Sequence, residues 1–260
     1  MSVYKALFLV TALTALASTS AWAADDPFVG TWKGTQYGGA GQVQQIKNLG
    51  GNKYQLIYGD NHLELIADGK ERPYKFGGTY LARQDSPDQC VITRKHDGQV
   101  TSVDTWTLSD GDRQWNSKTK GTRPDGSSFT SEATRTRIGA GSGFAGKWKV
   151  KNATFSSAPV MIIKPYGNDG LSFRWPRDKE HQDIKFDGKD YPGLGPRVAH
   201  GITSSAKRTG EHTIQATDKL NGKVTDTHEL KVSEDGRTLT DTIHVQGEQK
   251  PFVNVWEKQM

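Results

Sequence analysis

The hexapeptides FVGTWK (residues 28–33) and FAGKWK (residues 144–149) repeat one pattern of Phe, Gly, Trp and Lys at two distant points of the chain. Further matches follow in the same order along both halves. They pair KYQLIY (53–58) with the stretch ending at Trp175, Asp68-Gly69-Lys70 with Asp187-Gly188-Lys189, DGQVTSVDTWTLSDGD (97–112) with NGKVTDTHELKVSEDG (221–236), and the strand holding Phe129 with KPFVNVWEK around Phe252. The offset between the matches drifts only from about 116 to 124 residues, which indicates two copies of one structural unit.

The repeat predicts two domains of similar size. The first covers residues 24–137 and the second residues 144–260, joined by the linker IGAGSG at 138–143. Each length suits one small domain with its own core.

Short alternating segments fill both copies and predict β-strands. Asp-Gly and Asn-Gly pairs, which favour tight hairpin turns, separate many of them. Alternation with a period of two is typical of half-buried strands. It is clearest in KYQLIY (53–58), QVTSVDTWTL (99–108), SFTSEATRTR (128–137), HTIQAT (212–217), KVTDTHELKV (223–232) and TLTDTIHVQ (238–246). The sequence therefore predicts an all-β chain of two tandem antiparallel up-and-down β-barrels.

The N-terminus predicts a cleaved signal peptide over residues 1–23. One lysine precedes the apolar run ALFLVTALTALA, and Ala21-Trp22-Ala23 fits the small-x-small pattern before a cleavage site. An amphipathic first helix is the alternative, but no polar face recurs there. We therefore expect the mature chain to begin at Ala24 and to be periplasmic or secreted.

Composition disfavours several classes of protein. The 34 Lys and Arg and 29 Asp and Glu are well mixed, so the net charge of +5 does not predict a nucleic-acid partner. A mean hydropathy of -0.70 and the charged end VWEKQM argue against an outer-membrane barrel, and we expect no transmembrane segment in the mature chain.

Cys90 is the only cysteine, which excludes an internal disulfide and favours a buried structural thiol.

The two Gly-x-Trp motifs, Gly30-Thr31-Trp32 and Gly146-Lys147-Trp148, each followed by hairpin strands, resemble the lipocalin or calycin superfamily. FDGKDYP (186–192) and SEDGRTLTDT (233–242) are also similar to lipocalin-like domains of exported bacterial proteins. The resemblance implies that each tryptophan closes one end of a barrel beneath a basic residue of the last strand. The implied partners are Arg135 or Arg137 for Trp32, and Lys258 for Trp148.

Barrels of this size leave little internal space. Eight strands enclose an interior that is either filled by side chains or large enough for one small ligand. Each copy is shorter than a typical lipocalin and lacks the disulfide of that family, so the resemblance bears on barrel form more than on ligand binding.

Histidines are concentrated in the second copy, which holds five of the seven. Alternation places His212 on one face with Ile214 and His228 on one face with Leu230, so both are expected to point inward. No close histidine pair supplies the nucleus of a zinc site, so we predict no metal site. The first copy has Asp104 where the second has His228.

Other catalytic patterns are missing from the sequence. No Gly-x-Ser-x-Gly nucleophile turn, phosphate-binding loop or dinucleotide fingerprint occurs, and GAGSG at 139–143 has the wrong spacing. Asp110 and Asp112 are explained by turn formation. The sequence therefore implies no cofactor and predicts a protein that is not an enzyme.

FRWPRDKEHQD (173–183) is the stretch most suggestive of recognition. Trp175 ends a predicted strand and lies between Arg174 and Arg177, a combination that could hold a carboxylate, a sugar or a partner surface. An exposed hairpin tip is the alternative. Tyr58 occupies the corresponding place in the first copy and is a further candidate.

These observations leave three functional hypotheses. A small hydrophobic or amphipathic ligand binds in a barrel mouth; or loops such as 175–183 dock an envelope protein in a non-catalytic or stress role; or His212 or His228 serves as the acid or base of a hydrolase or isomerase. The sequence favours the first, narrowly ahead of the second.

Overall fold

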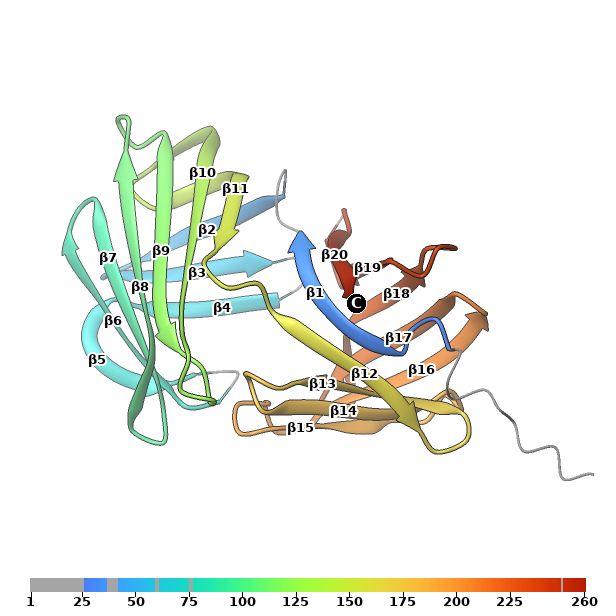
Figure 1. Cartoon of the computed structure of the whole chain (residues 1–260). Coiled ribbons are helices and arrows are strands. Elements are labelled where there is room, and N and C mark those ends of the chain that lie inside the picture. Colours follow the sequence, from blue (N-terminus) through green and yellow to red (C-terminus); the bar gives the residue numbers. More distant parts are fainter. Residues whose placement is uncertain (1–25, 37–41, 59–60, 75–76, 249) are drawn as a thin grey trace, which may run out of the picture.

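The structure is a computed structural model that describes residues 26–36, 42–58, 61–74, 77–248 and 250–260. All regular elements in these residues are β-strands, and they form two antiparallel sheets shaped as barrels (Figure 1). The predicted all-β class with two antiparallel barrels is confirmed. Among the residues described, no helix has the length and apolar character needed to cross a membrane.

We call the nearly closed sheet the first barrel. Its order is β4-β3-β2-β11-β10-β9-β8-β7-β6-β5. The strands are β2 (Val43–Gly50), β3 (Lys53–Tyr58), β4 (Asn61–Ile66), β5 (Asp68–Pro73), β6 (Thr79–Ser86), β7 (Gln89–His96), β8 (Gln99–Ser109), β9 (Gln114–Thr122), β10 (Ser128–Ser142) and β11 (Ala145–Phe155).

We call the closed sheet the second barrel. Its order is β1-β12-β13-β14-β15-β16-β17-β18-β19-β20, with β1 hydrogen-bonded to both β12 and β20. The strands are β1 (Gly30–Gln36), β12 (Val160–Tyr166), β13 (Gly170–Trp175), β14 (Glu180–Lys185), β15 (Tyr191–Leu194), β16 (Ile202–Gly210), β17 (Thr213–Leu220), β18 (Lys223–Val232), β19 (Thr238–Val245) and β20 (Phe252–Gln259).

The opening strands of the two sequence copies are exchanged between the barrels. β1 closes the second barrel, where Trp32 lies opposite Met161 and Lys258. β11 lies between β10 and β2 in the first barrel, where Trp148 faces Arg137 and Gln44. In Figure 1 the blue β1 accordingly lies beside β12 and β20. The prediction that 24–137 and 144–260 each supply their own opening strand is therefore corrected.

The short connection at 138–143 explains the exchange. It is not a linker, because β10 extends to Ser142 and pairs with Ala145 across a two-residue turn that begins at Gly143. Gly143 has a φ of 56°, as such tight hairpins require. The hairpin holds β11 beside β10, so the equivalent place in the second barrel is free for β1, which carries the same Gly-x-Trp motif.

The exchange also changes the partners of the Gly-x-Trp tryptophans. The Lys258 ammonium lies over Trp32, 5.1 Å from its ring centroid, and the Arg137 guanidinium lies over Trp148 at 4.1 Å. The implied pairs, Arg135 or Arg137 with Trp32 and Lys258 with Trp148, are wrong because each last strand meets the opening strand of the other copy. Arg135 instead lies over Trp115 at 4.0 Å.

The glycine of each motif makes room for its cation. Gly30 has a φ of 148°, and a Cβ there would lie 2.6 Å from Cε of Lys258. Gly146 has a φ of 144°, and its Cβ would lie 2.5 Å from Nη1 of Arg137. A side chain at either position would displace the cation from the indole face.

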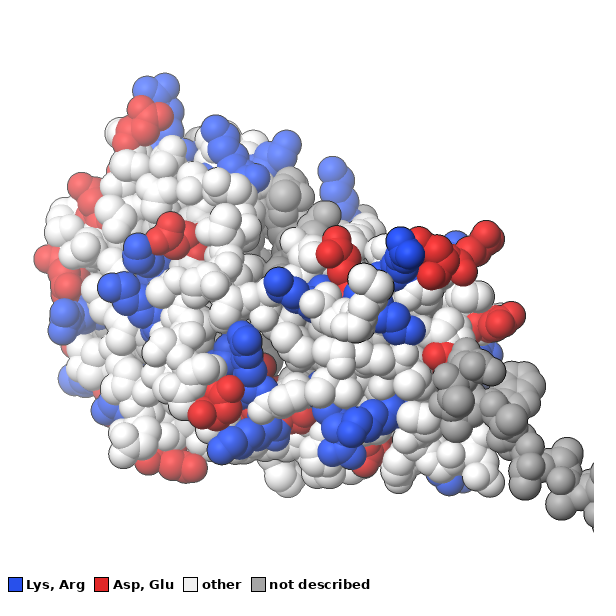
Figure 2. All heavy atoms as spheres, viewed as in Figure 1, with Lys and Arg blue, Asp and Glu red and all other residues white. Residues whose placement is uncertain are grey.

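Each barrel encloses its own hydrophobic core. Cys90 is 1% exposed in the first core, as expected for a structural thiol, and burial raises its pKa to about 12. On the face seen in Figure 2, basic and acidic side chains are interspersed over both barrels. This mixture agrees with the absence of a basic cluster in the sequence.

Candidate ligand pocket

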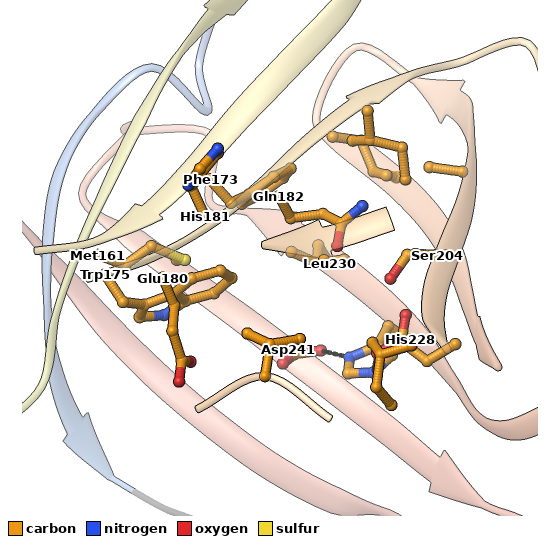
Figure 3. Close-up of a pocket in the computed structure, with 18 of the residues that line it drawn as sticks. Met161, Phe173, Trp175, Glu180, His181, Gln182, Ser204, His228, Leu230 and Asp241 are labelled. Carbon is orange, nitrogen blue, oxygen red and sulfur yellow. Dashed lines mark hydrogen bonds and ion pairs between the residues drawn. The ribbon is translucent and has the colours of Figure 1, made fainter. Parts of the chain in front are cut away.

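A cavity of about 450 Å³ occupies the interior of the second barrel (Figure 3). It is bordered by inward-facing side chains of β12 to β20 and by the loop between β15 and β16. Its apolar wall includes Met161, Phe173, Trp175, Leu230, Leu239 and Trp256, and its polar groups are Glu180, His181, Gln182, Arg197, Ser204, Asp218, His228 and Asp241. An apolar cavity with a few polar groups is typical of a small-molecule site.

The cavity follows from two substitutions between the sequence copies. In the first barrel, Trp106 lies opposite Ser117 and Trp115 lies opposite Leu108. At the equivalent register positions of the second barrel, Leu230 lies opposite Asp241 and Leu239 lies opposite Val232. Two indoles are therefore replaced by two smaller isobutyl groups.

The first barrel is filled where the second is hollow. The ring centroids of Trp106 and Trp115 are 4.8 Å apart, and those of Trp115 and Trp148 are 5.8 Å apart. Phe144 packs against Trp106 at 5.7 Å. In the second barrel, Trp256 fills part of this volume. It lies opposite Leu239, at the position that Arg135 holds opposite Trp115 in the first barrel. The second barrel therefore has one indole where the first barrel has two, and the difference in side-chain volume leaves the cavity.

His228 lies at the cavity wall within a cluster of three aspartates. Its Nδ1 is 2.9 Å from Oδ1 of Asp241, the contact drawn as a dashed line in Figure 3. Its Nε2 is 3.2 Å from Oδ1 of Asp226 and 3.5 Å from Oδ2 of Asp218. We call these four residues the His228 cluster. In the first barrel, Asp104 stands at the place of His228 and accepts a hydrogen bond from Trp106.

The aspartates keep His228 protonated. Burial lowers the pKa of His228, but the hydrogen bonds to Asp218, Asp226 and Asp241 outweigh burial and raise this pKa to about 12. An imidazolium at neutral pH cannot accept a proton from a substrate, so His228 is unsuited to be a general base.

The titration of His228 gives a pH prediction. Its folded pKa lies above the value of 6.5 expected when unfolded, so its contribution to stability is complete below about pH 6.5 and is lost as pH rises toward about 12. In NMR spectra, the His228 ring signals should show no titration step between about pH 5 and 9. A midpoint near pH 7 would contradict the cluster geometry.

Glu180 and Arg197 supply the other charges of the cavity. Burial and the neighbouring Asp178 raise the pKa of Glu180, while Arg197 opposes that rise. Arg197 also donates from Nη1 to the carbonyl oxygen of Thr122 at 2.9 Å. This bond ties a cavity-lining side chain to the first barrel.

The candidates proposed from sequence divide into three groups. Trp175 and His228 line the cavity. His212 precedes β17 and is not among the lining residues, and its buried Nδ1 has no hydrogen-bond partner among the described residues. Arg174 is exposed, 3.7 Å from Asp183, and Arg177 is not a lining residue either. The Tyr58 side chain lies outside the described part of the structure.

The loop at 175–183 contacts the first barrel of the same chain. Arg123 donates from Nη1 to Oδ1 of Asp178 at 2.9 Å, and the Asp125 amide donates to the carbonyl oxygen of Arg177 at 3.1 Å. The turn between β9 and β10 thus packs against the turn between β13 and β14. Part of this charged loop is therefore explained by contact between the barrels.

Sequence reasoning missed the three aspartates of the His228 cluster. Asp226 and His228 are two residues apart on β18, so alternation places them on one face. Asp218 and Asp241 come from the neighbouring strands and lie opposite Asp226 and Leu230. The first pair was detectable in the sequence, whereas the other two required the strand register.

No protein-family model, curated protein or solved structure matches this chain. The assignment of two antiparallel barrels accordingly depends on the strand pairing of the chain itself. The lipocalin-like type of these barrels stays a prediction.

Proposed function

We propose that this protein is an exported carrier of the lipocalin-like type, and that its second barrel binds one small amphipathic ligand. The cavity carries this proposal, because about 450 Å³ falls within the range of roughly 300–1,000 Å³ typical of small-molecule sites. The signal peptide expected at residues 1–23 supports release into the periplasm or the exterior.

The contrast between the barrels supports a specific role for the cavity. Both copies retain the Gly-x-Trp motif and its cation, but only the first fills its centre with Trp106 and Trp115. In this proposal the first barrel is a structural partner that contacts the cavity loops through Arg123 and Thr122. Because the loop at 175–183 has this internal contact, we do not extend the proposal to an envelope protein.

Filling the cavity should abolish binding. Leu230→Trp restores the residue found at the equivalent position of the first barrel, and its indole would occupy the cavity at the cost of about 1–3 kcal/mol of overpacking. We expect the neutral apolar dye N-phenyl-1-naphthylamine to bind the unmodified protein once per chain, with affinity at least about tenfold lower in Leu230→Trp. Fluorescence titration and native mass spectrometry measure both quantities.

Val100→Trp is the matched control, since Val100 is 53% exposed and the same indole is added outside the cavity. It should bind the dye as the unmodified protein does. Equal binding by all three proteins would mean that the dye occupies another place and would overturn the proposal.

A further inference from the structure

The His228 cluster has more acceptors than its own donors satisfy. A protonated imidazole offers two N–H groups, and these face three carboxylates. The three contacts use one oxygen each of Asp218, Asp226 and Asp241. The side chains of His228 and Asp241 are only 18% and 14% exposed, so water screens the cluster incompletely.

Cations from elsewhere in the described chain do not balance these carboxylates. No lysine or arginine of the described residues forms an ion pair with Asp218, Asp226 or Asp241; His228 is their cationic partner. Arg197, the other cation lining the cavity, interacts with Glu180 and Thr122. The cluster therefore places three negative groups around one positive group, two of the three at the cavity wall.

Aromatic side chains line the same cavity. Phe173, Trp175 and Trp256 border it together with Asp218 and Asp241. A cation is attracted both to carboxylates and to the negative face of an aromatic ring, and these attractions increase when water is excluded. Figure 3 shows Met161 and Trp175 at the left of the view and Asp241 with His228 below its centre, and all four border one cavity, so apolar and acidic surfaces are within reach of one molecule.

We propose that the ligand of the second barrel is an amphipathic cation, with an apolar body between Met161, Trp175 and Leu230 and an ammonium group against Asp218 and Asp241. This inference rests on the proposed carrier function and specifies the chemical class of its ligand. Ser204 also donates a hydrogen bond to Asp218, and the ammonium supplies further N–H donors and the positive charge that the cluster lacks.

A metal ion is the competing occupant. Ligand atoms of Asp218, Asp226 and His228 lie within 4.8 Å of one another, close enough to surround one cation. A metal would have to displace the imidazole proton to use the Nε2 atom. It would also leave the apolar wall of the cavity without a partner, and for this reason we favour an organic cation.

Three probes with the same ten-carbon chain test the ligand class: decylammonium, decanol and decanoate. We expect calorimetric titration, with a chelator present, to show decylammonium binding at least about tenfold more tightly than decanol, with decanoate weakest. The double variant Asp218→Asn/Asp241→Asn should reduce the preference for decylammonium to within about threefold. Asp190→Asn is the control, because it removes one charge from an exposed ion pair with Lys219 outside the cavity.

Three other results of the titrations would contradict the proposal. Decanol or decanoate binding as tightly as decylammonium, with all binding blocked by Leu230→Trp, would overturn the cation class and preserve the carrier function. Uptake of zinc or manganese without an ammonium preference would also overturn it. Failure of the three probes alone would overturn the cation class, whereas failure of the three probes and of N-phenyl-1-naphthylamine would overturn both proposals. If the double variant does not fold, the three affinities of the unmodified protein still decide the question.

Discussion

Replacing Trp32 by alanine is expected to destabilise the second barrel, not the first, by about 3–5 kcal/mol, the usual cost of truncating a large buried aromatic residue. Trp32 is fully buried, donates from Nε1 to the carbonyl oxygen of Phe28 at 2.8 Å and lies beneath Lys258. Its loss would open a cavity between β1 and β20. Hydrogen exchange measured by mass spectrometry should show lost protection over 160–259.

Trp148→Ala is the internal control for this experiment. Trp148 has the same burial and the same bond, from Nε1 to the carbonyl oxygen of Phe144 at 2.8 Å, but its strand lies in the first barrel. Its replacement should deprotect residues 43–142. If each variant instead deprotected the half of the chain in which it lies, the strand exchange would be refuted.

Replacing His228 by alanine is expected to lower the free energy of unfolding by about 2–4 kcal/mol near neutral pH, since removing one partner leaves buried charges uncompensated. The cost should fall short of that for a fully buried pair, because the Asp218 side chain is 34% exposed. Chemical denaturation of the variant and the unmodified protein measures the difference.

Two comparisons isolate the electrostatic part of this effect. His244→Ala removes an exposed histidine from β19 and should change stability by less than about 0.5 kcal/mol. Adding Asp226→Asn to His228→Ala should recover part of the loss, because one uncompensated carboxylate disappears. A double variant less stable than His228→Ala alone would contradict the charge imbalance inferred for the cluster.

The strands and turns could be predicted from the sequence because each depends on residues that are close together in the chain. Alternation and Asp-Gly turns predicted the strands, and the repeated hexapeptide predicted two copies. The hexapeptide alone did not indicate the exchange, since FVGTWK and FAGKWK carry Phe, Gly, Trp and Lys at the same positions. Only the two-residue turn after Ser142 decides which barrel receives β11.

Two residues of the candidate site could be predicted from the sequence. Alternation identified His228, and the position of Trp175 at a strand end identified a second lining residue. The cavity itself depends on residues that meet across strands, such as Leu230 with Asp241 and Leu239 with Trp256. The register of these strands is set by pairing along the whole sheet, so it could not be predicted from the sequence of a single strand.

The methionine methyl groups offer the most direct test of ligand binding inside the second barrel. Met161 lines the cavity and is 4% exposed, whereas Met260 is fully exposed at the C-terminus, and Met1 falls within the predicted signal peptide. In ¹³C-methyl NMR of the mature chain, decylammonium should shift the Met161 signal in a saturable manner and leave Met260 unchanged. Binding that leaves Met161 unshifted would place the ligand outside the second barrel and contradict the proposed function.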